Sequence, residues 1–359
     1  MAKCVFCNQT AKEKNKEHVV PKWLIELTGS PKRVAFFGMD IAKEESRSFA
    51  WQALTAPACE DCNESFSGLE NDAKSAMQSI LQDGRATEEE FDTLLNWFDK
   101  VRVGTWLMSL LLDGRTKTID PAYGIAQRLS TADRSLAIYK VTDQEDGISL
   151  SATQDPLFEY QPSAFSLRVN DTIFINASCA FMNSKFLGFP YPRRKRWTKD
   201  DSGRPTYFAE DFRCQAKPGK RGPSILSIFP ETLIHQAILP KGYVAEDGSI
   251  PGRPQAVDYI TRHMINDEWG ERSSIFQETR DGLRPLTDIG GKSSPQPMYR
   301  SDMATRAKIE AQVYDIRKAL FDESQGPSGQ TQTRFHREAV KLNRIMRDHV
   351  ASLDGRTAT

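Results

Sequence analysis

The sequence predicts an α+β fold, in which a cysteine-containing module precedes a larger mixed α/β region with an antiparallel sheet and terminal helices. The observations behind this prediction are two Cys-x2-Cys pairs near the start of the chain, a helical apolar pattern after Thr87, and short strand-like runs from about 135 to 240. At 359 residues, the chain is longer than one hydrophobic core usually supports. We expect a cysteine module, a helical connector, a β-rich domain and a mainly helical C-terminal region, at 1–82, 83–130, 131–255 and 256–359.

Composition and charge restrict the class of protein. The 48 Lys and Arg residues balance 48 Asp and Glu residues, and 39% of the chain is hydrophobic, which is enough for a folded core. Proteins that coat nucleic acid by bulk charge are usually strongly basic, so any nucleic-acid contact should be local. No apolar run reaches the roughly 18 residues of a membrane span, and residues 1–8 lack the apolar segment of a signal peptide. We therefore expect a cytoplasmic protein with no membrane partner.

Four of the six cysteines form two pairs of equal spacing, namely Cys4, Cys7, Cys59 and Cys62. Two intervening residues allow a turn that brings two sulfurs within about 2.3 Å of one zinc ion. The pattern predicts one structural zinc per chain, which closes the loop between the pairs. A disulfide framework or a chance spacing is the alternative, but a long chain of intracellular type has little use for paired disulfides.

Two further segments accompany the cysteines. Residues 16–24 read Lys-Glu-His-Val-Val-Pro-Lys-Trp-Leu, and the second pair continues as Cys-Glu-Asp-Cys-Asn-Glu-Ser-Phe-Ser-Gly-Leu-Glu at 59–70. In combination, these motifs resemble the HNH nucleases with a ββα-metal fold, in particular the zinc-stapled endonuclease VII type. The resemblance covers about the first 80 residues. It implies a module that hydrolyses DNA phosphodiester bonds and leaves 5′-phosphate and 3′-hydroxyl ends.

The resemblance also implies residue roles. Glu17 and Asn63 would bind a catalytic Mg²⁺ or Mn²⁺, and His18 would activate the attacking water as a general base. Each has a structural alternative: Glu17 is a solvated acid in a Lys-rich stretch, Asn63 is a helix N-cap, and His18 is a hydrogen-bonded histidine. Glu70 shares a helical face with Asn63 but also fits a capping box with Ser67, so we expect it to be structural.

The sequence departs from the family pattern at one position. Many HNH proteins have an asparagine about five residues before the second cysteine pair, and it helps to orient the catalytic histidine. Residues 53–58 contain no asparagine, which leaves the partner of His18 unassigned. Because one ββα-metal site cuts one strand per event, double-strand cleavage would need a homodimer or two encounters.

The rest of the sequence predicts helices and strands but no further catalytic or metal-binding motif. Thr87-x-x-Glu90 is a capping box for a helix that ends before Gly114, and Trp97 and Lys100 within it are expected to pack. Apolar runs predict strands, which we place at 136–141, 165–169, 172–176 and 225–229. Further helices are expected at 301–323 and 333–353, and Cys179 and Cys214 should be buried thiols.

The most basic segment lies at 189–221, with ten Lys and Arg residues against four acidic ones. Basic and aromatic side chains together suit phosphate contacts and base stacking, so this segment is a candidate nucleic-acid surface. Its centre reads Arg193, Arg194, Lys195, Arg196 and Trp197. A solvated basic loop or a surface for a protein partner is the alternative.

Two functions therefore remain open. The first is a metal-dependent HNH endonuclease that acts on DNA, with RNA as a second candidate substrate. Its C-terminal part would select the target or bind a protein partner, as in effectors of bacterial antiviral defence or of mobile elements. The second is a non-catalytic zinc-containing module that binds nucleic acid or protein.

Overall fold

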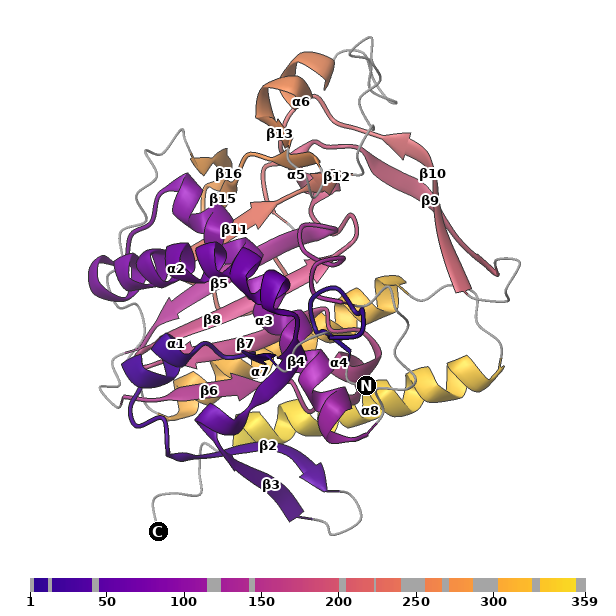
Figure 1. Ribbon diagram of the computed structural model, residues 1–359. Coiled ribbons are helices and arrows are strands. Elements are labelled where there is room, and N and C mark those ends of the chain that lie inside the picture. The colour runs from indigo at the N-terminus through magenta and orange to yellow at the C-terminus, as the bar shows by residue number, and fades with distance from the viewer. Residues whose placement is uncertain are drawn as a thin grey trace.

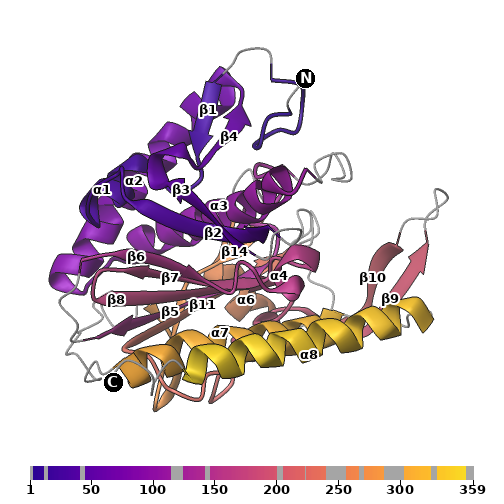
Figure 2. The same ribbon diagram turned by 90° about the horizontal axis from the view of Figure 1, so that it is seen from below.

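The computed structural model describes residues 3–11, 15–40, 45–114, 124–141, 146–199, 205–222, 224–239, 256–266, 271–286, 303–324 and 330–352. Its centre is a seven-stranded sheet with helices on both faces (Figures 1 and 2). The predicted α+β class with an antiparallel sheet and terminal helices is confirmed. Among the described helices, none combines the length and the apolar character that a membrane span requires.

The central sheet is antiparallel throughout. Its strands in spatial order are β16 (Gly282–Pro285), β15 (Phe276–Thr279), β11 (Thr232–Gln236), β5 (Asp133–Lys140), β8 (Thr172–Cys179), β7 (Ala164–Val169) and β6 (Ile148–Ser151). Because successive side chains of a strand point to opposite faces, Leu136 and Ile138 enter one core cluster while Ala137 and Tyr139 enter another. The sheet thus separates two hydrophobic cores.

Long helices cover both faces. Helix α3 (Glu88–Leu112) packs on one face beside α2 (Glu60–Asp83), and α7 (Met303–Ser324) packs on the other beside α8 (Gln330–Ser352). The predicted capping box forms at the start of α3, where Thr87 and Glu90 each bond the other's backbone N–H. The helices predicted after Thr87, at 301–323 and at 333–353 are confirmed.

The strand predictions have mixed outcomes. Those at 136–141, 165–169 and 172–176 are confirmed, but residues 225–229 form a loop, so that prediction was wrong. Side chains satisfy the backbone of this loop in place of a neighbouring strand: Gln312 accepts from the Ile228 N–H at 2.6 Å, and the Tyr139 hydroxyl donates to its carbonyl at 2.9 Å. An apolar run reveals burial of side chains without revealing which groups bond its backbone.

Several shorter elements complete the described chain. The N-terminal part contains β1 (Asn15–His18), α1 (Lys22–Leu27), β2 (Val34–Asp40), β3 (Glu45–Ala50), η1 (Trp51–Ala53) and β4 (Thr55–Ala58). The later part contains α4 (Pro156–Tyr160), α5 (Ser184–Leu187), β9 (Tyr191–Lys199), β10 (Pro205–Arg213), β12 (Ile238–Leu239), α6 (Val257–His263), β13 (Met264–Asn266) and β14 (Glu271–Ser273). Strands β13 to β16 lie in the range predicted to be mainly helical and were not anticipated.

The cysteine module and the sheet share one core. A single buried cluster includes Cys4, Phe66 of α2, Trp97 of α3 and Phe174 of β8. The four predicted regions stay a prediction. Of the two unpaired cysteines, Cys214 is buried as expected, whereas Cys179 is only half-buried because it ends β8.

A buried charge network also fixes α3 to the sheet. The Arg134 guanidinium, which is fully buried, bonds Asp99 and Asp92 of α3 at 3.3 Å each. Arg102 bonds Asp99 at 2.7 Å and the Pro162 carbonyl at 2.8 Å. Because buried charges need partners, this network holds α3 in one position on the strands.

Candidate functional site

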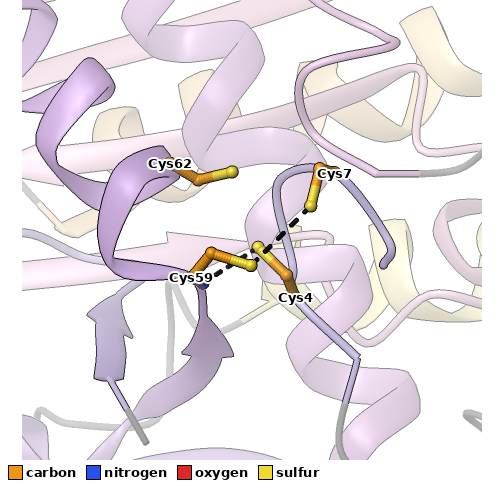
Figure 3. Close-up of side chains that lie close together, drawn as sticks. All are labelled: Cys4, Cys7, Cys59 and Cys62. Carbon is orange, nitrogen blue, oxygen red and sulfur yellow. Dashed lines mark hydrogen bonds between the residues drawn. The ribbon is translucent and has the colours of Figure 1, made fainter. Parts of the chain in front are cut away.

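The four paired cysteines meet at the start of α2 (Figure 3). Cys4 and Cys7 lie in an N-terminal turn, Cys59 is the N-cap of α2, and Cys62 lies in its first turn. Their sulfur atoms all lie within 4.8 Å of one another, and the Cys7 and Cys59 sulfurs are 3.9 Å apart. Tetrahedral coordination with bonds of about 2.3 Å would separate sulfurs by about 3.8 Å. The cluster can therefore hold a metal ion, and all four cysteines are free of disulfides.

Backbone groups and burial set the electrostatics of this cluster. The Cys59 N–H donates to the Cys4 sulfur at 3.2 Å. Burial tends to raise the pKa of Cys4, but hydrogen bonds from the backbone of Cys7 and Cys59 outweigh it and lower the pKa. Burial and the neighbouring sulfurs raise the pKa of Cys59 to about 11 and raise that of Cys62 further. Cys4 is thus the sulfur most readily ionised of these three.

A polar pocket of about 470 Å³ lies beside the cluster. It is lined by residues of β1, α2 and α3, namely Asn15, Glu17, Glu60, Asn63, Glu64, Phe66, Ser67, Glu70, Asn71 and Lys100. Helix α2 begins right after Cys59, which places Asn63 and Glu70 on the same side of the helix. The structure thus brings Glu17 and Asn63, two of the three predicted catalytic residues, to one pocket.

His18 is placed differently. It follows Glu17 in β1, which pairs regularly with β4, so the two side chains point to opposite faces of the strand. His18 is half-buried and is not among the residues that line the Glu17 pocket. Burial, helped by the charges of Lys22 and Lys16, lowers its pKa. Its Nδ1 atom is buried without a hydrogen-bond partner among the described residues, so the missing orienting group is still unassigned.

Lys100 contacts the candidate site directly, although the sequence predicted that it only packs. Its ammonium lies 2.6 Å from the Glu17 carboxylate and also bonds Glu70. Lys100 is 1% exposed and Glu17 is 7% exposed. Burial tends to lower the Lys100 pKa, but the carboxylates of Glu70 and Glu17 raise it overall. Burial also raises the Glu17 pKa, and the Lys100 charge opposes this rise.

Glu70 also belongs to this group of polar side chains, and the sequence did not predict its contacts. Its carboxylate accepts from the indole N–H of Trp23 at 3.1 Å and from that of Trp97 at 3.3 Å. The predicted capping box at Ser67 is wrong, because Ser67 lies inside α2 and donates to the Glu64 carbonyl. The spacing of seven residues from Asn63 to Glu70 was the available signal. Nothing in the sequence pointed to Lys100, which is 83 residues from Glu17.

The basic segment forms an antiparallel ribbon of β9 and β10 that leads away from the layered body (Figures 1 and 2). Arg193, Arg194 and Lys195 are exposed on β9. The opposite strand carries acidic residues, with Glu210 directly across from Arg194. Arg196 and Trp197 also belong to β9, but their side chains lie outside the described part of the chain. The structure therefore presents at least three predicted basic residues on one projecting element.

Comparison of the chain with protein families, with curated proteins and with solved structures finds no match.

Proposed function

We propose that the protein is a metal-dependent endonuclease of the HNH type that hydrolyses DNA phosphodiester bonds. The observation that supports this most is the shared pocket of Glu17 and Asn63, directly beside four clustered cysteines. The cysteines would hold a structural zinc, whose binding commonly contributes about 10–16 kcal/mol in small zinc domains. This zinc would fix the turn at Cys4 and Cys7 to the start of α2, and so fix Asn63.

Within this proposal, Glu17 and Asn63 would hold Mg²⁺ or Mn²⁺ through their oxygen atoms. The bound ion would neutralise charge on the substrate phosphate. His18 would take a proton from the attacking water, which requires substrate to reach the His18 face of β1. Lys100 competes with a divalent ion for Glu17, so metal binding requires its ammonium to move away from Glu17 while Glu70 remains its partner.

A second function is favoured by a specific observation. The Lys100 ammonium already pairs with Glu17 and Glu70, and His18 does not line their pocket. Both features suit a non-catalytic zinc-containing module that binds nucleic acid or protein, in which the ion pair stabilises the fold. The alternative shares the zinc with the first proposal and differs in having no hydrolytic activity.

Plasmid cleavage separates the two functions. The purified protein is incubated with supercoiled plasmid and Mg²⁺, Mn²⁺ or EDTA, beside His18→Ala, Asn63→Ala and the control His349→Ala on the exposed side of α8. The nuclease proposal expects metal-dependent nicking by wild type and the control, and a loss of about 100-fold or more in His18→Ala. Identical plasmid profiles for all variants would support the non-catalytic function. The same assay on single-stranded RNA tests the second candidate substrate.

The charge distribution bears on how such a nuclease would reach DNA. The net charge is zero, and the exposed basic residues identified above gather on the β9–β10 ribbon. We propose that the ribbon contacts DNA phosphates and that tight binding requires a homodimer or a protein partner, as expected for an effector of antiviral defence or of a mobile element. Sedimentation of the protein with and without DNA measures whether it forms the homodimer.

A further inference from the structure

Three polar side chains form a hydrogen-bonded line across neighbouring strands of the central sheet, on the face that α7 covers. Ser135 of β5 lies directly opposite His235 of β11, and its hydroxyl is 2.7 Å from His235 Nδ1. The other ring nitrogen, Nε2, is 2.9 Å from the Glu278 carboxylate on β15. His235 is 2% exposed and Glu278 is 7% exposed, so both groups are held away from solvent.

The serine end of this line opens into a pocket of about 390 Å³, a volume within the range of small-molecule sites. Ser135 and His235 both line this pocket. Its walls are mostly apolar and come from β5, β8, β11 and α7 and from the segments 182–186 and 222–226, with Ala137, Ile175, Leu226, Leu233, Ile316 and Leu320 among them. The pocket is separate from the candidate nuclease site, because its sheet face packs against α7 rather than α3.

One tautomer of His235 satisfies both of its hydrogen bonds in this line. In the neutral imidazole that carries its proton on Nε2, that N–H donates to Glu278 and Nδ1 accepts from the Ser135 hydroxyl. The Asn183 side-chain amide donates to the Ser135 oxygen at 3.0 Å and to the Arg134 carbonyl at 2.9 Å. In this tautomer the serine proton has two acceptors, His235 Nδ1 at 2.7 Å and the Asn183 side-chain oxygen at 3.3 Å, and the nitrogen is the nearer of the two.

We propose that this pocket is a second active site, a serine esterase that takes carboxylic esters with an apolar acyl group. Nucleophile, base and orienting acid are within the hydrogen-bond distances that such chemistry requires. The Ser135 oxygen attacks the acyl carbonyl while His235 Nδ1 takes its proton, and the imidazolium then protonates the departing alcohol as the ester C–O bond breaks. His235 then deprotonates a water that attacks the acyl-serine, and the imidazolium returns this proton to the Ser135 oxygen as the acyl C–O bond breaks and the carboxylic acid leaves. The Asn183 amide bonds the Ser135 oxygen and the Arg134 carbonyl, so it must release one of these bonds to stabilise the developing oxyanion.

Glu278 is a positioning residue in this site, because it touches His235 and not the substrate. Its own placement depends on a close approach of Gly222, where an added Cβ would lie 2.2 Å from the Glu278 carboxylate oxygen. A side chain at 222 would therefore displace Glu278 without directly contacting Ser135. The positioning role predicts a fall in kcat with little change in KM when the Glu278 charge is removed.

Covalent labelling tests the nucleophile. The intact protein is treated with an alkyl fluorophosphonate and the modified residue is identified by peptide mass spectrometry. Wild type should acquire one adduct at Ser135, which is lost in Ser135→Ala and reduced at least about tenfold in His235→Ala. The matched control is Ser166→Ala, which changes a buried serine on β7 of the same sheet whose hydroxyl has no hydrogen-bond partner among the described residues. No adduct on wild type that is folded by circular dichroism would overturn the proposal.

Ester hydrolysis tests the substrate class and the positioning residue. With p-nitrophenyl butyrate and octanoate, Glu278→Gln should lower kcat by at least about tenfold and leave KM within about twofold. Ala319→Phe, which fills the pocket from α7, should raise KM for octanoate more than for butyrate. If ester hydrolysis persists in Ser135→Ala, or if wild type and every folded variant lack it, the esterase proposal is wrong. The hydrogen bonds between Ser135, His235 and Glu278 would then serve only to hold the strands together. The control Ser166→Ala should hydrolyse esters as wild type does, and ester hydrolysis without added Mg²⁺ or Mn²⁺ separates this outcome from that of the nuclease proposal.

Discussion

Replacing Lys100 by Met removes the cation between Glu17 and Glu70 and keeps a similar side-chain length. The ammonium is 2.6 Å from the Glu17 carboxylate, and at an effective dielectric constant of about 20 this pair attracts by about 6 kcal/mol. Desolvation of both groups cancels much of that attraction. The loss of one partner, however, leaves a buried carboxylate without its counter-charge, which typically costs about 3–5 kcal/mol. We expect Lys100→Met to be less stable than wild type by this amount.

Urea unfolding with zinc present measures the effect in a double-mutant cycle. Glu17→Gln combined with Lys100→Met should recover part of the loss, because the amide carries no charge to be left unpaired, whereas the Glu70 carboxylate still lacks its counter-charge. Lys74→Met changes an exposed lysine on α2 and should alter stability by no more than about 0.5 kcal/mol. If Lys100→Met is as stable as wild type, or if the double variant recovers nothing, the buried ion pair is not what stabilises this site.

Three further predictions test other parts of the molecule. Metal analysis should find about one zinc per chain, and Cys59→Ser should lose both the zinc and thermal stability. Wild type without zinc would contradict the predicted structural zinc site. Replacing Arg193 and Arg194 by Ala should weaken DNA binding and flatten its salt dependence by about one unit of log–log slope per lost phosphate contact, whereas unchanged binding would assign the ribbon to a protein partner. Burial raises the pKa of Asp133 from 3.8 to about 6, so the folded state holds this proton more tightly than the unfolded state does. The stability that this provides is complete below pH 3.8 and is lost as the pH rises through about 6. Between pH 4 and 7, the unfolding free energy of wild type should therefore fall by about 2 kcal/mol relative to that of Asp133→Asn, and parallel curves would refute this.

Local sequence signals predicted the elements whose causes are local. The capping box at Thr87 and the apolar stripe after it predicted α3, and the equal spacing of the cysteine pairs predicted a cluster that the structure forms. The loop at 225–229 shows where such signals fail. Its apolar residues resemble a strand, but side chains of Tyr139 and Gln312 bond its backbone, and the sequence gives no indication of those distant partners.

The candidate site divides in the same way. Glu17, His18 and Asn63 were found from the sequence because they lie next to recognisable cysteine pairs. Lys100 was not found, because a lysine in an apolar helix looks the same whether it reaches solvent or a buried carboxylate. Strand geometry placed His18 on the face opposite Glu17, although the resemblance implied that both serve one site.

By itself, the sequence determined an α+β chain with a four-cysteine cluster and an acid, a histidine and an asparagine close to it, since spacing and periodicity act over a few residues. The tertiary structure alone decided that Lys100 closes the Glu17 pocket and that Ser135, His235 and Glu278 align across three strands. These residues are far apart along the chain, and only strand register and helix packing bring them within hydrogen-bond distance. Long-range pairing of this kind is set by the whole core, and a single sequence carries no local signal of it.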